Sequence, residues 1–157
     1  LGVVAEIAMF FFMSSVMRRY SLRRILIASF AVAVGRFLLI GWCANLPVLI
    51  FAQTLHSLTF GAFHAASIAA INHWFRGSAR ARGQALYSSV AFGAGGLLGG
   101  LVSGWSWDHL GGAMAFTLSS LFALVGLVFV VKWVKMGDAD EPTGMNAVDT
   151  NPDRSRG

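Results

Sequence analysis

The chain has 157 residues, of which 56% are hydrophobic and only 12% are charged, and its formal net charge is +5. Several apolar runs approach the roughly 20 residues that a helix needs to cross a hydrocarbon core about 30 Å thick. This composition is typical of an integral membrane protein and excludes an ordinary soluble domain. The basic residues form short clusters without a basic stripe or a nucleic-acid-binding motif, so no nucleic-acid partner is predicted.

Five membrane spans are predicted from the points at which the charged residues stop. In chain order they cover residues 1–17, 25–44, 47–75, 83–105 and 113–134. Each is expected to be helical, because a backbone in lipid must satisfy its own hydrogen bonds and the strand alternation of a barrel is absent. The predicted fold is therefore all-α and transmembrane, with one helical bundle over residues 1–135.

The two ends of the chain differ from these spans. Residues 136–157 hold five of the seven acidic residues and two of the three prolines, which predicts a disordered cytoplasmic tail. The chain begins with Leu1 instead of methionine, and its first apolar run has neither a basic leader nor a small-residue cleavage site. We therefore expect the sequence to begin within, or just before, a membrane span.

Lysine and arginine occur on alternate connections between the predicted spans. Nine of them lie on one side: four in residues 18–24, three in 76–82 and two in 132–135. The other connections, WCANLP and WSWDHLGG, contain none. The positive-inside bias therefore predicts a multi-pass protein of the cell inner (plasma) membrane with a cytoplasmic C-terminus. The basic clusters are expected to face the anionic headgroups of the lipid bilayer.

Ionisable side chains inside spans are costly and usually face a cavity or a partner helix. At 1.5 Å per residue, Glu6, Arg36 and His56 each lie about 14–18 Å from one end of their span. Three helices would thus bring a carboxylate, a guanidinium and an imidazole to one layer. On the third span Gln53 and His64 share a stripe that has His56 at its edge. These five residues are the candidates for substrate binding or a proton relay.

Each ionisable candidate also has a purely structural interpretation. Glu6 and Arg36 fit a buried ion pair that serves packing alone, and His56 and His64 fit neutral histidines hydrogen-bonded to a neighbouring helix. A proton relay, by contrast, needs a group whose protonation changes with its surroundings, which His56 in the same layer would supply. His73 lies at the end of its span and is predicted to be interfacial.

The fourth predicted span contains two rows of small residues at four-residue spacing, which predict close helix packing. The rows are Gly96, Gly100 and Gly104, and Gly95, Gly99 and Ser103.

A membrane-bound metalloenzyme is a competing class of function. Its ligands would be His56, His64 and His73, but metal ligands on one helix need three- or four-residue spacing, and neither HxxxH nor HExxH occurs. Cys43 is the only cysteine, so there is no CxxC motif either. We therefore predict no metal, no cofactor and no enzymatic activity.

Several stretches resemble a known family: LGVVAEIAMFFF, MRRYSLRR, VGRFLLIGW, QTLHSLTFGAFHAA and RGQALYSSVAFG. Over residues 1–135 the chain resembles the C-terminal half of a major facilitator superfamily transporter, within the phenylpropionate permease group of 3-phenylpropionate/proton symporters. The resemblance implies that the five helices correspond to spans 8–12 of a twelve-helix fold. It also implies that the partner is an N-terminal half with spans 1–7.

The function implied by the resemblance is proton-coupled uptake of a small organic solute such as 3-phenylpropionate, with Arg36 able to pair with the anion. In similar sugar/proton symporters the histidine corresponding to His56 is followed three residues later by a glutamate. Here Thr59 takes that place, so Glu6 is the preferred proton acceptor. The alternatives are a sugar or nucleoside/proton symporter, a drug exporter of the same superfamily, or a structural membrane fragment or subunit without independent activity.

Overall fold

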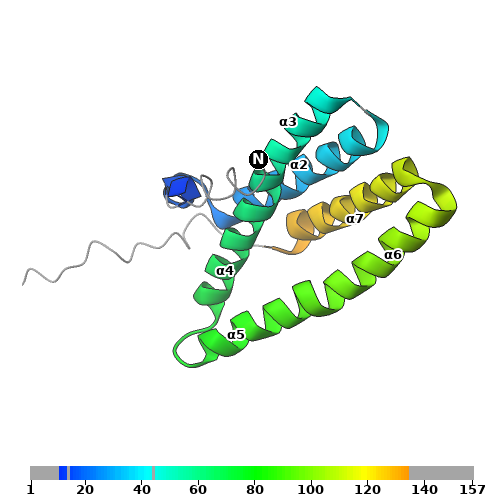
Figure 1. The fold of residues 1–157 in the computed structure, drawn as a ribbon. Coiled ribbons are helices and arrows are strands. Elements are labelled where there is room, and N and C mark those ends of the chain that lie inside the picture. Colours follow the sequence, from blue (N-terminus) through cyan, green and yellow to red (C-terminus); the bar gives the residue numbers. More distant parts are fainter. Residues whose placement is uncertain (1–10, 14, 44, 135–157) are drawn as a thin grey trace, which may run out of the picture.

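A computed structural model of the chain describes residues 11–13, 15–43 and 45–134. All regular elements in these residues are helical, which confirms the predicted all-α fold for the described part of the chain (Figure 1). A short helical segment at 11–13 and 15–19 precedes four rods. The rods are α2 (Leu22–Trp42); α3 (Leu46–His56), π-helical η1 (Ser57–Gly61) and α4 (Ala62–Trp74); α5 (Ala79–Ser88), π-helical η2 (Ser89–Ala94) and α6 (Gly95–Leu110); and α7 (Gly112–Trp133).

All four rods are long and apolar enough to cross a membrane. They contain 21, 29, 32 and 22 residues, and their 18-residue apolar windows have mean hydropathies of 2.1, 1.4, 1.5 and 2.4. They match the predicted spans 25–44, 47–75, 83–105 and 113–134. The first predicted span lies largely, and the predicted tail wholly, outside the described residues.

The rods begin and end at capping residues. These residues do not coincide with the charged residues that were used to predict the ends of the spans. The helix α2 begins three residues before the predicted span, because the Ser21 side chain accepts a hydrogen bond from the backbone N–H of Arg24 at 3.4 Å. The third rod runs beyond 83–105 at both ends. It stops at Gly111, whose φ of +82° suits glycine and turns the chain into α7.

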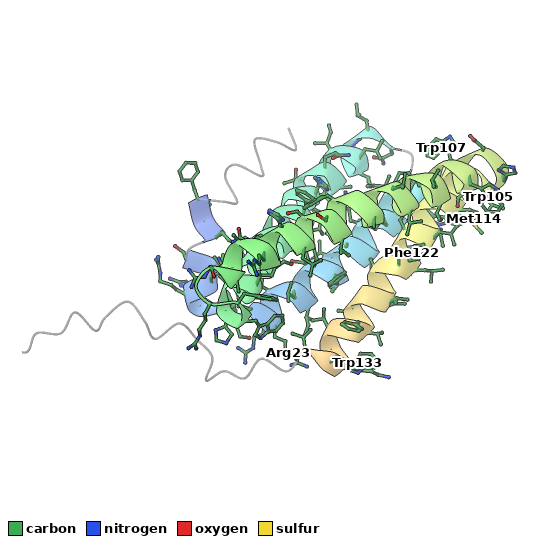
Figure 2. The ribbon with its side chains drawn as sticks, turned by 90° about the horizontal axis from the view of Figure 1, so that it is seen from below. Arg23, Trp105, Trp107, Met114, Phe122 and Trp133 are labelled. Carbon is green, nitrogen blue, oxygen red and sulfur yellow. The ribbon has the colours of Figure 1, made fainter. Side chains whose placement is uncertain are left out.

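The helices α2 and α7 pack antiparallel and are joined by side-chain hydrogen bonds at both ends and in the middle. The bonds run from Arg23 Nη2 to the Val131 carbonyl (2.9 Å), from Ser120 Oγ to the Val34 carbonyl (3.1 Å), and from Trp42 Nε1 to Thr117 Oγ1 (3.1 Å). Figure 2 shows Arg23 and Trp133 at one end of the bundle and Trp105, Trp107 and Met114 at the other. Tryptophan at both ends is typical of a membrane-spanning bundle.

The buried apolar core lies where α2, α4 and α7 meet near the Arg23 end. It consists of Met13, Ile25, Leu26, Ala62, Ala66, Ala70 and Val130. The alanines of α4 recur every fourth residue and let this helix approach its neighbours closely. The α5–α6 rod lies along the outside of this core and meets α7 at one end and α4 at the other (Figure 1).

The glycine rows of α6 do not make the close helix contacts predicted for them within the described structure. A Cβ added at Gly96, Gly99, Gly100 or Gly104 would meet nothing within 4 Å. One row instead lines a cavity through Gly95, Gly99 and Ser103. The small side chains leave volume there, and the sequence pattern alone does not distinguish that open volume from a tight contact.

Close helix approach occurs instead at Gly41, between α2 and α7. A Cβ at this position would lie 2.9 Å from the Phe116 Cβ and 3.1 Å from the Ala113 carbonyl oxygen, which is backbone. We expect Gly41→Val to destabilise the folded protein by about 1–3 kcal/mol through overpacking. The thermal unfolding temperature of the detergent-solubilised protein measures this loss. Gly35→Val is the matched control, since nothing lies within 4 Å of that position, and an equal effect of both variants would contradict the packing assigned to Gly41.

Candidate functional site

A cavity of about 640 Å³ lies between α2, the α3–η1–α4 rod, α6 and α7. Most of its wall is apolar, and much of that is aromatic. A volume of this size with few polar groups is typical of a small-molecule site. The polar or ionisable residues of the wall are Ser29, Arg36, His56, Thr59, Ser103, Ser106 and Ser119.

Arg36 is the only lysine or arginine on this wall as the described residues form it. It is 8% exposed, and its Cζ lies 4.5 Å from the centre of the Phe37 ring. Its Nε is buried and has no hydrogen-bond partner among the described residues. A guanidinium has five N–H donors in a fixed fork that matches a carboxylate. Arg36 therefore offers the cavity a positive charge, and at least one of its donors has no partner in the part of the chain that the structure describes.

His56 reaches the same cavity from the end of α3. Its ring stacks on Phe60, with centroids 5.6 Å apart and an angle of 14° between the planes. The chain between them enters η1, and residues four apart lie on the same side of a helix. Imidazole changes charge near neutral pH, so His56 adds a titratable polar group to a wall that already carries Arg36.

Most hydroxyl groups of the wall donate hydrogen bonds to backbone carbonyls of their own helices. Ser29, Thr59, Ser106 and Ser119 donate to backbone carbonyls three or four residues earlier, over distances of 2.6–3.0 Å. A hydroxyl has one proton and two lone pairs, so these groups present acceptor oxygens. Among the described residues, the charged donors suited to an anion are therefore those of Arg36 and, depending on its protonation, His56, while Ser103 is the one hydroxyl of the wall without such a bond.

The remaining candidates lie elsewhere. Gln53 is exposed on α3 and does not line the cavity. His64 lies on α4 beyond Phe60, where its Nδ1 is 3.3 Å from the Tyr87 hydroxyl. Glu6 lies outside the described residues. The predicted stripe is thus divided, because the η1 segment and the Phe60 ring separate the two histidines.

Sequence reasoning missed the aromatic part of the wall. Phe30, Phe37, Phe63 and Phe122 all line the cavity. Phenylalanine is equally common on helix faces that contact lipid, so nothing in the sequence marks these four. Within the described residues, no three His, Cys, Asp or Glu side chains lie close enough together to hold a metal ion.

Residues 1–118 match the profile of the MFS_1 like family, which covers most of the chain and includes all five candidate residues. The chain belongs to this family. It is 36% identical over 124 residues to the Probable 3-phenylpropionic acid transporter of Escherichia coli (strain K12), and the match covers 79% of the chain. The chain spans about a third, 32%, of that relative's length. No solved structure matches the chain significantly.

Membership of the MFS_1 like family confirms the resemblance to phenylpropionate permeases of the major facilitator superfamily. Together with the four apolar rods, it identifies a multi-pass membrane protein. The family profile ends in the first third of α7, so it covers every helix that lines the cavity for at least part of its length.

Proposed function

We propose that this MFS_1-like chain is part of a secondary active transporter that takes up a small aromatic carboxylate, such as 3-phenylpropionate, together with a proton. The observation that carries this proposal is Arg36, a buried guanidinium on the wall of an aromatic cavity, whose Nε has no hydrogen-bond partner among the described residues. A phenyl ring fits the phenylalanine surfaces, and a carboxylate fits the guanidinium. The name of the Escherichia coli relative supports the same class of solute.

The alternatives within the superfamily fit the cavity less well. A sugar or a nucleoside needs several hydrogen-bond donors and acceptors, whereas most hydroxyl protons of this wall already bond backbone carbonyls. A cationic drug would face the positive charge of Arg36 in a medium that screens it poorly. A neutral exported compound would make no use of the positive charge of that guanidinium.

In the proposed cycle, Glu6 takes up a proton from outside and loses its attraction for Arg36. The guanidinium then becomes available to the solute carboxylate, while His56 adjusts its protonation to the changed charge nearby. A site that holds only the proton carries the unpaired positive charge of Arg36, whereas the site that holds both the proton and the carboxylate has no net charge from these groups. The helical half can therefore rock against its partner at lower cost once both are bound. The partner is the N-terminal half, spans 1–7, and the basic ends of the helices face the cytoplasm of a cell whose inner membrane holds the protein.

The proposal is tested by uptake of labelled 3-phenylpropionate into energised cells that express the full-length product of the gene encoding this chain. Cells without the gene serve as the baseline. We expect uptake against the gradient that an uncoupler abolishes. Uptake that is insensitive to the uncoupler would contradict proton coupling, and no uptake above baseline would contradict the proposed solute.

A further inference from the structure

The cavity stops halfway along two of the rods that form it. On the α3–η1–α4 rod the lining residues run from His56 to Phe63, and on the neighbouring rod they run from Gly95 to Ser106. Residues 64–74 and 79–94 on one side of this stretch, and residues 46–55 and 107–110 on the other, do not line it. The π-helical segment η1 lies within the lining stretch of its rod, and η2 directly precedes Gly95, the first lining residue of the other rod. Such segments often occur at functional sites.

Residues 64–74 and 79–94, which do not line the cavity, are joined to each other by side-chain contacts. The His64 Nδ1 and the Tyr87 hydroxyl are 3.3 Å apart, and Gln84 Nε2 donates to Asn72 Oδ1 at 2.9 Å. The Phe92 ring packs edge-on against the rings of both His64 and Tyr87, at centroid distances of 5.7 and 6.1 Å. A cluster of rings thus joins the two rods beside the cavity.

Phe60 is part of both the cavity wall and the ring cluster of His64, Tyr87 and Phe92. Its ring stacks on His56 on the cavity side and on His64 on the far side, with centroids 5.6 and 6.2 Å apart and planes within 14° and 4° of parallel. The Phe92 ring meets it edge-on at 6.3 Å. Among the described residues that line the cavity, it is the only one whose ring contacts either His64 or Phe92 in this way.

These contacts hold the ring in one orientation while leaving surface for a solute. Stacked and edge-on ring pairs each add to the stability of an aromatic cluster. Phe60 nevertheless remains 40% exposed, so part of the ring is still accessible. A rigid aromatic surface at the end of a cavity limits how far a bound molecule can extend, because a packed ring does not yield without breaking its contacts.

We infer that Phe60 is the floor of the cavity and determines the length of the solute that it accepts. The carboxylate is held by Arg36, and the ring of the solute then meets the Phe60 floor at a fixed distance. A smaller side chain at this position would extend the cavity toward His64 and the Tyr87 hydroxyl. The prediction of solute length rests on the proposed function, whereas the position of the floor does not.

The solute-length prediction is tested by comparing uptake of 3-phenylpropionate and 5-phenylpentanoate by the full-length protein and by Phe60→Leu. We expect wild type to prefer the shorter acid. Phe60→Leu should raise the ratio of longer to shorter acid about tenfold, since two more methylene groups find apolar room. Phe129→Leu is the matched control, because Phe129 is exposed on α7, stacks on Trp133 and lies outside the cavity. An unchanged ratio in Phe60→Leu, with uptake intact, would overturn the inference.

The position of the floor is tested separately by thiol labelling, which needs no transported solute. His64→Cys is made with Cys43→Ser, and a membrane-impermeant thiol reagent is added in turn to right-side-out and inside-out vesicles. With Phe60 present, labelling through the cavity should be slow, and Phe60→Leu should accelerate it severalfold from one side. Equal labelling rates of His64→Cys from the two sides of the membrane would overturn the assignment of Phe60 as the floor. If wild type takes up neither acid, the proposed function fails and this labelling still decides the inference.

Discussion

Replacing Arg36 by glutamine is expected to lower kcat/KM for 3-phenylpropionate uptake about 100-fold, since a hydrogen bond to a charged group contributes about 1.5–3 kcal/mol and the fixed charge is lost as well. Arg36→Lys keeps the charge but loses the planar fork, so it should retain more activity than Arg36→Gln. Uptake of labelled acid at several concentrations, corrected for the amount of protein in the membrane, separates the two variants.

The matched control for this experiment is Arg24→Gln. Arg24 is exposed at the start of α2 and does not line the cavity. The control removes the same charge from the same helix and should leave uptake close to wild type. If Arg36→Gln and Arg24→Gln behave alike, Arg36 does not hold the solute, and its buried position serves packing only.

Replacing Glu6 by glutamine is expected to abolish uphill uptake, because a glutamine cannot release a proton and so keeps the site in a state that resembles the protonated acid. Exchange of labelled for unlabelled 3-phenylpropionate across the membrane should persist, since exchange needs no net proton movement. Glu6 lies outside the described residues, so this prediction rests on its position in the first predicted span and on the family match over residues 1–118.

The comparison of net uptake with exchange gives the Glu6 experiment its control within the same cells. Loss of net uptake with intact exchange would assign Glu6 to the proton relay. Loss of both would indicate that Glu6 is needed for folding or for solute binding. Wild-type net uptake by Glu6→Gln would leave Glu6 with no part in coupling.

The fold could be predicted from the sequence because a lipid bilayer permits few backbone structures. The positions of Arg23, Arg24, Arg80 and Arg82 mark where the apolar segments stop, and a backbone in lipid must then be helical. The ends of the helices were less predictable, since they depend on caps such as Ser21 and on the turn at Gly111. Those local hydrogen bonds extend a helix past the charges that limit its apolar part.

The candidate site was only partly predictable from the sequence. Depth along each helix placed Arg36 and His56 in one layer, and the structure brings both to one cavity. Depth does not reveal which way a side chain turns, so it did not separate Gln53 and His64 from that cavity. The separation depends on η1 and on the ring of Phe60, and neither a π-helical turn nor an aromatic floor has a clear signature in a single sequence.

The central claim is that the cavity around Arg36 binds a carboxylate together with an aromatic ring. Its most direct test is displacement of labelled 3-phenylpropionate from the purified full-length protein by unlabelled 3-phenylpropionate and by 3-phenylpropanamide, which has nearly the same shape without the charge. We predict that the amide competes at least about tenfold more weakly, since it cannot form the charge-assisted pair with the guanidinium. Equal competition by acid and amide would contradict the account.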